Sequence, residues 1–167
     1  MFLKKPYAFW YGVFYYYMDG FVDIEKRVRQ FDVNKILEEV WKNPVVQKFI
    51  TNLITEDQLY EQGEDGDGTF LGDYTDYSVI LKLQGDGDKR IDHITLKDSG
   101  DFYRSVEVIA NQKGFRTEAN PIKDDGTNLY NRFGSNIIKL NEKNTKLLID
   151  FIEPYFNMEA EKQLSRK

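Results

Sequence analysis

Few residues in this chain are of the types that carry out catalysis or bind transition metals. Among its 167 residues there is one histidine, His93, and there is no cysteine. A single histidine excludes histidine-pair metal motifs and nearly every charge-relay arrangement. The lack of cysteine excludes thiolate zinc sites, cysteine nucleophiles and disulfides. Any reaction would therefore depend on carboxylates, with His93 as the single imidazole base.

A pair of carboxylates could come from four aspartates in the second half of the chain: Asp98, Asp101, Asp124 and Asp125. They stand in segments with glycine and lysine, where acidic side chains are usually solvated caps. Asp98 precedes Ser99 and Gly100 and predicts a helix N-cap. His93 has the position of a half-buried strand residue. Because no convergent set of nucleophile, base and metal ligands emerges, we predict that the chain is not an enzyme and holds no cofactor.

The acidic segment 61–76 indicates a second kind of chemistry, since it has six carboxylates, four glycines and no basic residue. Five of its residues stand at ligand positions of a calcium-binding loop: Asp65, Asp67, Thr69, Asp73 and Asp76. However, Phe70 stands where that loop needs glycine, and Asp76 stands where it needs a bidentate glutamate. We predict a solvated, turn-rich loop, with calcium binding as the alternative.

The composition is that of a single folded domain without a nucleic-acid partner. A length of 167 residues fits one domain and leaves room for a buried core. Hydrophobic residues make up 41% of the chain and charged residues 31%, and the formal net charge is −5. The basic residues form no dense run, so a phosphate backbone would repel such a chain. We therefore predict no direct nucleic-acid recognition.

The N-terminal segment is rich in aromatic residues. Ten of them lie between positions 2 and 21: Phe2, Tyr7, Phe9, Trp10, Tyr11, Phe14, Tyr15, Tyr16, Tyr17 and Phe21. The segment ends without the small residues of a signal-peptide cleavage site. Its uncharged stretch, Pro6 to Met18, is shorter than the about 20 residues that span a bilayer. Neither a signal peptide nor a transmembrane helix is predicted here.

Three interpretations of this segment remain open. It could pack on its own domain, it could dock on another subunit, or it could lie at a membrane surface, for which Lys4 and Lys5 are weak support. We expect protein partners and no membrane partner. The predicted interface residues are Phe9, Trp10, Tyr11, Phe14, Tyr15 and Tyr16.

Helical patterns occur toward both ends of the chain. Apolar residues recur at helical spacing over 22–41 and over 44–60, and Asn43-Pro44 separates the two helices. A short helix is predicted over 127–133. The last helix begins after Asn141 as its N-cap. The residues on its predicted inner face are Thr145, Leu148, Ile149, Ile152 and Phe156.

Strand patterns lie between these helices. Residues 77–83 predict a strand, and residues 91–96 predict a return strand or an extended approach to one. Residues 105–110 and 115–119 flank Asn-Gln-Lys-Gly and predict a hairpin. The expected fold class is therefore α+β, with N-terminal helices, a small antiparallel sheet and a C-terminal helix. We expect an aromatic docking segment at 1–21, one α+β domain at 22–158 and a polar, frayed tail at 159–167.

One segment resembles a known family of phage proteins. Residues 95–108 are similar to a motif, Leu-x-x-[Thr/Ser]-Gly-x-[Leu/Phe]-x-x-Ser-[Ile/Val]-x-Val, of tailed-phage virion-morphogenesis and tail-completion proteins. The matching residues are Leu96, Ser99, Gly100, Phe102, Ser105, Val106 and Val108. Further along, Tyr130, Phe133 and Gly134 match a later element of that family. Residues 58–63 together with 95–103 also look similar to structural proteins from phages of gut Bacteroidetes.

The resemblance covers residues 74–156 and implies a structural protein of the virion. Such proteins join the tail to the capsid connector as a homo-oligomeric ring, so the implied partners are copies of the chain and other neck or tail proteins. The implied location is the virion, assembled in the host cytoplasm. The chain departs from the family at Ser135–Leu140, which replaces its proline-containing link. A non-enzymatic adaptor that docks through the aromatic N-terminal segment is the alternative.

Overall fold

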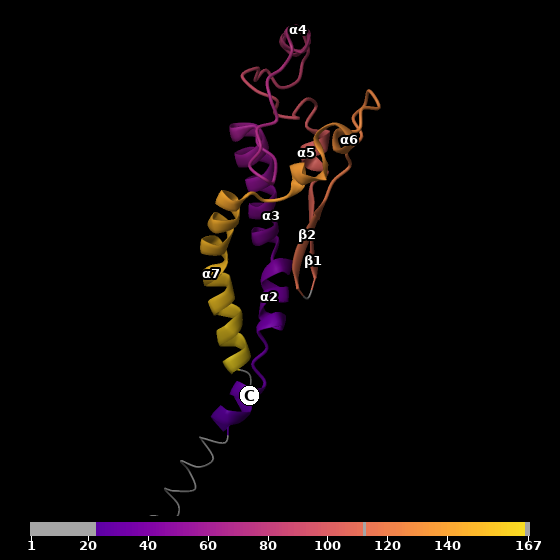
Figure 1. The fold of residues 1–167 in the computed structure, drawn as a ribbon. Coiled ribbons are helices and arrows are strands. Elements are labelled where there is room, and N and C mark those ends of the chain that lie inside the picture. The colour runs from indigo at the N-terminus through magenta and orange to yellow at the C-terminus, as the bar shows by residue number, and fades with distance from the viewer. Residues whose placement is uncertain (1–22, 112, 166–167) are drawn as a thin grey trace, which may run out of the picture.

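A computed structural model describes residues 23–111 and 113–165 and is drawn in Figure 1. The six predicted interface residues, from Phe9 to Tyr16, lie outside these residues. The described part is mostly helical and has one two-stranded antiparallel sheet, which confirms the predicted α+β class. The molecule is elongated, with helix α4 (Asp76–Gln84) at one tip and residues 23–29 at the other (Figure 1).

Two helices in line run along the molecule. α2 (Val33–Lys42) begins after Asp32, whose carboxylate accepts two amide hydrogens of the first turn. α3 (Pro44–Asn52) begins after Asn43, which caps it in the same way. Proline suits the first position because that residue's amide would have no intrahelical partner. The predicted break at Asn43 is confirmed, but the predicted helix over 22–41 is interrupted by a turn before Asp32.

α3 continues directly into a π-helix, η1 (Leu53–Gln62), so the chain is helical throughout the predicted range 44–60. π-helical stretches of this length are uncommon. η1 ends at Gly63, which has a φ of +63° in the left-handed region. A Cβ at this position would lie 2.4 Å from Cδ2 of His93, so both the backbone angle and the space require glycine.

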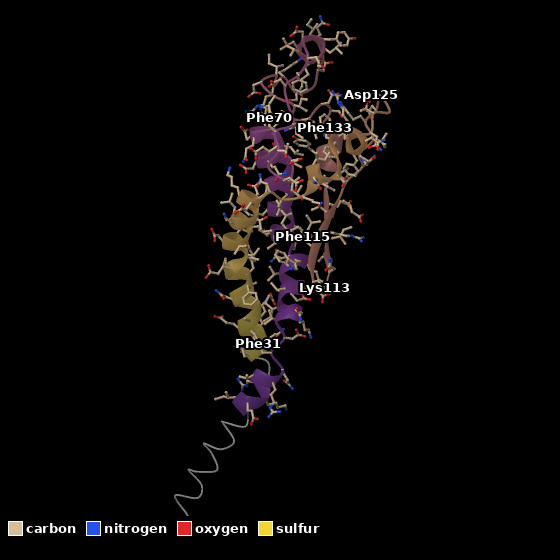
Figure 2. All side chains as sticks on the ribbon, viewed as in Figure 1. Phe31, Phe70, Lys113, Phe115, Asp125 and Phe133 are labelled. Atoms are coloured by element: carbon tan, nitrogen blue, oxygen red, sulfur yellow. The ribbon has the colours of Figure 1, made fainter. Side chains whose placement is uncertain are left out.

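The apolar core lies where α2, α3 and η1 meet the sheet and the last helix. Its side chains with less than 2% exposure include Ile36, Val40, Val46, Ile50, Ile54, Leu59 and Ile137. Aromatic rings pack at its edge: the rings of Trp41 and Phe115 lie 5.1 Å apart, and Phe49 stacks on Phe151 at 3.8 Å. Figure 2 shows Phe115 at the sheet, facing the paired helices. Burial of these side chains is the main favourable contribution to folding in this part of the molecule.

The predicted hairpin is confirmed. β1 (Glu107–Asn111) pairs with β2 (Gly114–Glu118), and both strands contact α2. The helix predicted over 127–133 is confirmed as α6. The short helices near the hairpin are α5 (Asp101–Arg104), α6 (Leu129–Phe133) and the 3-10 helix η2 (Ser135–Ile138).

The last helix, α7 (Glu142–Ser165), runs back beside α2 and α3 (Figure 1). It starts at Asn141 as predicted, since the Asn141 carboxamide accepts the amide hydrogen of Asn144 (2.8 Å). A buried polar junction fixes this end. The Gln58 side chain accepts the amide hydrogen of Asn141 (2.9 Å), and Asn144 donates to the carbonyl of Leu53 (2.9 Å). These bonds join segments that are far apart in sequence and set how α7 lies against η1.

Two expectations for α7 are wrong. Of the predicted inner face, Leu148 is buried and Ile152 and Phe156 pack against the core as expected, but Thr145 and Ile149 are exposed. Phe151, which was not predicted there, packs inward. Residues 159–165 are helical, where we expected a frayed tail. The physical reason is a contact with the start of α2: the Gln163 carboxamide donates to the carbonyl of Asp32 (3.2 Å) and accepts its amide hydrogen (3.0 Å).

Neither strand predicted between 77 and 96 exists. Residues 77–83 belong to helix α4 (Asp76–Gln84), because the Thr75 hydroxyl accepts the amide hydrogen of Ser78 (3.3 Å) and caps a helix start. Residues 91–96 form no regular secondary structure. This segment contains Leu96, whose φ of +58° ends any extended run there.

Candidate functional site

Four of the five apolar side chains of α4 are exposed to solvent, and Val79 is half-buried. Tyr77 is 70% exposed, and Ile80, Leu81 and Leu83 are 51%, 50% and 54% exposed. None of the residues of α4 is buried. A surface helix normally turns its apolar stripe to the core and its polar face to water. α4 has the opposite arrangement, and we call its exposed residues Tyr77, Ile80, Leu81 and Leu83 the α4 face.

Lys82 holds the inner side of α4 through three hydrogen bonds. Its ammonium donates to the Asp88 carboxylate (2.7 Å), to the Asp88 carbonyl (3.2 Å) and to the carbonyl of Lys97 (3.2 Å). The side chains of Lys82 and Asp88 are only 11% and 10% exposed. The Lys82 ammonium also lies 4.9 Å from the centre of the Tyr74 ring. An ammonium with three donors is fully satisfied by this arrangement.

Asp88 receives further donors from the body of the molecule. The Tyr60 hydroxyl donates to it (3.1 Å), and the Thr95 hydroxyl lies 3.4 Å from its second oxygen. Burial by itself would raise the pKa of Asp88, but hydrogen bonds from Lys82 and Tyr60 and the charge of Lys82 outweigh it. The pKa of Asp88 is therefore lower than its ordinary value. Asp88 is accordingly a carboxylate held ionised inside the protein.

Tyrosines connect this ion pair to the rest of the fold. The Tyr103 hydroxyl donates to the carbonyl of Thr95 (2.5 Å), and the Thr95 amide donates to the Tyr74 hydroxyl (3.1 Å). Burial raises the pKa of Tyr103, so its hydroxyl stays protonated. The members of this group, which we call the Lys82–Asp88 cluster, are Tyr60, Tyr74, Lys82, Asp88, Thr95 and Tyr103.

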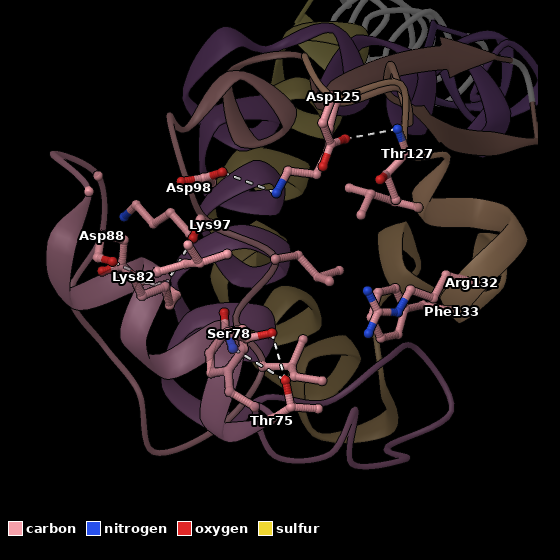
Figure 3. Close-up of a pocket in the computed structure, with 18 of the residues that line it drawn as sticks. Thr75, Ser78, Lys82, Asp88, Lys97, Asp98, Asp125, Thr127, Arg132 and Phe133 are labelled. Atoms are coloured by element: carbon pink, nitrogen blue, oxygen red, sulfur yellow. Dashed lines mark hydrogen bonds and ion pairs between the residues drawn. The ribbon is translucent and has the colours of Figure 1, made fainter.

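A cleft of about 410 Å³ lies between α4 and α6 (Figure 3). Lys82 and Asp88 line one side, and Arg132 and Phe133 of α6 line the opposite side. Lys123 on its rim pairs with Asp98 at 3.1 Å. The ion pairs in the lining are thus Lys82 with Asp88 and Lys123 with Asp98, while the Arg132 guanidinium lies 5.1 Å from the centre of the Phe133 ring. The arrangement holds α4 in place, and it contains no nucleophile activated by a neighbouring base.

The four aspartates singled out in the sequence do meet in space. Asp98, Asp101, Asp124 and Asp125 all line one crevice of about 140 Å³ beside α5. Hydrogen bonds from Ser99 and Arg104 lower the pKa of Asp101, and hydrogen bonds from Thr127 lower that of Asp125. A general acid at neutral pH needs a raised pKa. Asp101 and Asp125 therefore act as acceptors in turns. Asp98 accepts a hydrogen bond from Lys123 (3.1 Å) and does not cap α5, which begins after Gly100.

His93 lies apart from those carboxylates. Its ring is buried, and its Nε2 lies 2.9 Å from the carbonyl oxygen of Tyr60. A carbonyl only accepts, so this nitrogen carries a hydrogen. The ring packs against Gly63 at the end of η1 and positions that turn.

The residues predicted as calcium ligands make hydrogen bonds within the protein or begin a helix. Asp65 accepts the amide hydrogens of Asp67 and Thr69 (2.9 Å each), and Asp67 accepts a hydrogen bond from Asn136. Asp76 is the first residue of α4. Across residues 23–111 and 113–165, no group of three histidine, aspartate or glutamate side chains is close enough to hold a metal ion.

Sequence reasoning missed the α4 face and the Lys82–Asp88 cluster. One signal was present: Thr75 three residues before Ser78 is a helix-start pattern, and Tyr77, Ile80 and Leu81 have helical spacing. No signal in the sequence shows which side of that helix faces the protein.

Comparison with known proteins identifies no relative. No protein-family model matches the chain, and no curated protein or solved structure is significantly similar to it. In the part of the chain that the structure describes, no helix is both long and apolar enough to cross a membrane. The function has to be argued from the geometry.

Proposed function

We propose that this protein is a non-enzymatic assembly protein that binds other protein chains through the α4 face. The observation that carries the proposal is the orientation of α4, whose apolar residues point to solvent while Lys82 holds the helix from the inner side. Grouped, exposed apolar side chains mark interaction sites on folded proteins. Burial of each large one at an interface contributes about 1.5–3 kcal/mol.

The more specific form of this proposal is a structural protein of the phage neck or tail. The resemblance over residues 74–156 supports it, and that range includes α4, the hairpin and most of α7. In this proposal copies of the chain form a ring that joins the tail to the capsid connector, and other neck or tail proteins bind the ring. A contact between two different surfaces of identical subunits generates a ring when the rotation closes.

The mass of the full chain in solution tests the proposal. We expect light scattering to show a closed oligomer of about six or more copies as the concentration rises. Ile80→Lys should shift the protein toward monomer, because it places a charge at the centre of the α4 face. Ile149→Lys is the matched control, since Ile149 is also an exposed isoleucine in a helix.

Two outcomes would contradict parts of the proposal. A strict monomer at high concentration would remove the ring, and binding of one different chain through the α4 face would then favour an adaptor. Equal effects of Ile80→Lys and Ile149→Lys on the mass would remove the α4 face as the contact.

A further inference from the structure

The exposed side chains and the charge near the α4 face indicate which kind of partner would bind there. Large apolar side chains besides those of α4 are exposed nearby in the sequence, at Phe70 and Ile91. Residues 61–92 contain nine acidic residues and three basic ones, Lys82, Lys89 and Arg90. Lys82 pairs with Asp88, and Arg90 pairs with Glu61 and Asp92, so the segment keeps a net charge of −6. The complementary partner is therefore rich in large apolar or aromatic side chains and carries positive charge.

One segment of this chain has that composition. Residues 1–18 contain nine aromatic residues, and their only charged side chains are Lys4 and Lys5. The first acidic residue is Asp19. Aromatic side chains are favoured at the centre of protein interfaces because they bury a large area at a low cost in side-chain entropy. The aromatic segment and the α4 end thus match in both hydrophobicity and charge.

The position of the two ends favours a contact between copies. Residues 23–29, where the described chain begins, lie at the opposite tip from α4 (Figure 1). Their position is held by the end of α7, since Arg27 donates to the carbonyl of Leu164 (3.3 Å). To reach its own α4, the aromatic segment would have to pass along the whole molecule. A second copy placed end to end brings its α4 next to that segment directly.

We infer that the aromatic segment of one copy, residues 1–18, binds the α4 face of a second copy. This inference rests on the proposed function and names the partner of the α4 face. The contact joins two different surfaces, so each copy gives one segment and receives one. Repeated contacts of this kind produce a ring when they close and a filament when they do not.

Two full-length variants test the inference. The donor-defective variant carries Trp10→Ser and Phe14→Ser, and the acceptor-defective variant carries Ile80→Lys and Leu83→Lys. We expect each variant alone to be a monomer by light scattering. An equimolar mixture should form a dimer and nothing larger, because it restores one intact segment and one intact α4 face per pair.

A synthetic peptide of residues 1–18 gives a second measurement. Labelled with a fluorophore, it should bind the full-length donor-defective variant saturably, as followed by anisotropy. Adding Ile80→Lys and Leu83→Lys should weaken this binding at least about tenfold, the loss typical of central interface residues. Adding Ile149→Lys should leave it unchanged. Higher salt should weaken binding several-fold, since charge attraction between Lys4, Lys5 and the acidic end is screened.

The failure of the inference differs from the failure of the proposed function. A wild-type protein that stays monomeric overturns the ring form of the proposed function and the inference with it, whereas binding of a different chain through the α4 face would still support an adaptor. A donor-defective variant that assembles like the wild type overturns the inference alone, and so does a mixture that stays monomeric. Unchanged circular dichroism of both variants establishes that they are folded. For the acceptor-defective variant we expect this because Ile80 and Leu83 are 51% and 54% exposed.

Discussion

The two halves of this elongated molecule are stabilised in different ways. Around α2, α3 and α7, aliphatic side chains such as Ile50 and Ile54 are fully buried, and the helices turn their apolar faces inward. At the α4 end, the helix is held by the ion pair of Lys82 and Asp88, and its apolar face points outward. A helix that is held by its polar side keeps its apolar side available. We therefore propose that the α4 end serves binding, whereas the body provides the stability of the fold.

The largest effect should come from the body. Ile50→Ala removes a fully buried side chain between helices, and we expect it to lower the free energy of unfolding by about 2–5 kcal/mol. Val45→Ala, at an exposed position of the same helix, should change it by less than about 0.5 kcal/mol. Urea unfolding followed by circular dichroism measures both. If the two substitutions lowered the free energy of unfolding equally, Ile50 would not contribute more to stability than an exposed residue of the same helix.

At the α4 end, removal of one charge should be costly and removal of both should be milder. Lys82→Met leaves the Asp88 carboxylate buried without its partner and should destabilise the α4 end by about 2 kcal/mol. In the double variant Lys82→Met/Asp88→Leu no unpaired charge remains, so part of that loss should be recovered.

Hydrogen exchange of the α4 amides measures this prediction. Exchange should accelerate in α4 while the amides of α3 stay protected, because the body does not depend on the ion pair. Strictly additive effects of the two substitutions would show that Lys82 and Asp88 do not stabilise each other.

At acidic pH, α4 should lose the contacts that hold it to the rest of the protein. The folded-state pKa of Asp88 lies below its unfolded value, so its contribution is fully present above the unfolded pKa and is lost as the pH falls through the folded pKa. NMR signals of α4 should therefore lose their native positions below about pH 4, the ordinary pKa range of aspartate. The variant Asp88→Asn should show no such loss from this residue. Signals of α4 that are unchanged by acid in the wild-type protein would contradict this role of Asp88.

The smallest effect should come from a single neutral hydrogen bond of the cluster. Tyr103→Phe removes the bond to the carbonyl of Thr95 but keeps the ring, and it should cost about 1 kcal/mol. Tyr77→Phe, at the most exposed tyrosine of α4, should leave thermal stability unchanged. Calorimetry of the two variants compares a hydroxyl inside the cluster with one on the α4 face. A larger loss of thermal stability for Tyr77→Phe than for Tyr103→Phe would contradict the assignment of Tyr77 to the exposed side of α4.

Elements specified by nearby residues could be predicted. The break at Asn43-Pro44, the start of α7 at Asn141 and the hairpin all depend on local backbone preferences, and the structure has them where the pattern indicated. Residues 77–83 were assigned wrongly because Tyr77, Val79 and Ile80 are of residue types that favour strands. The helix cap at Thr75 outweighs that preference. The aspartates near α5 were found by residue type, yet their neighbours use them as hydrogen-bond acceptors.

The sequence by itself determined the fold class, the main helices and the hairpin, because caps, turns and hydrophobic spacing act over a few residues. It also showed which segment is aromatic and basic and which is acidic. Only the tertiary structure decided which side of α4 faces solvent. That choice depends on Lys82 meeting Asp88, Thr95 and two tyrosines from separate segments, and no local pattern encodes such a meeting. In the fold, α4 lies at the opposite tip from residues 23–29, and the proposed contact between copies rests on that arrangement.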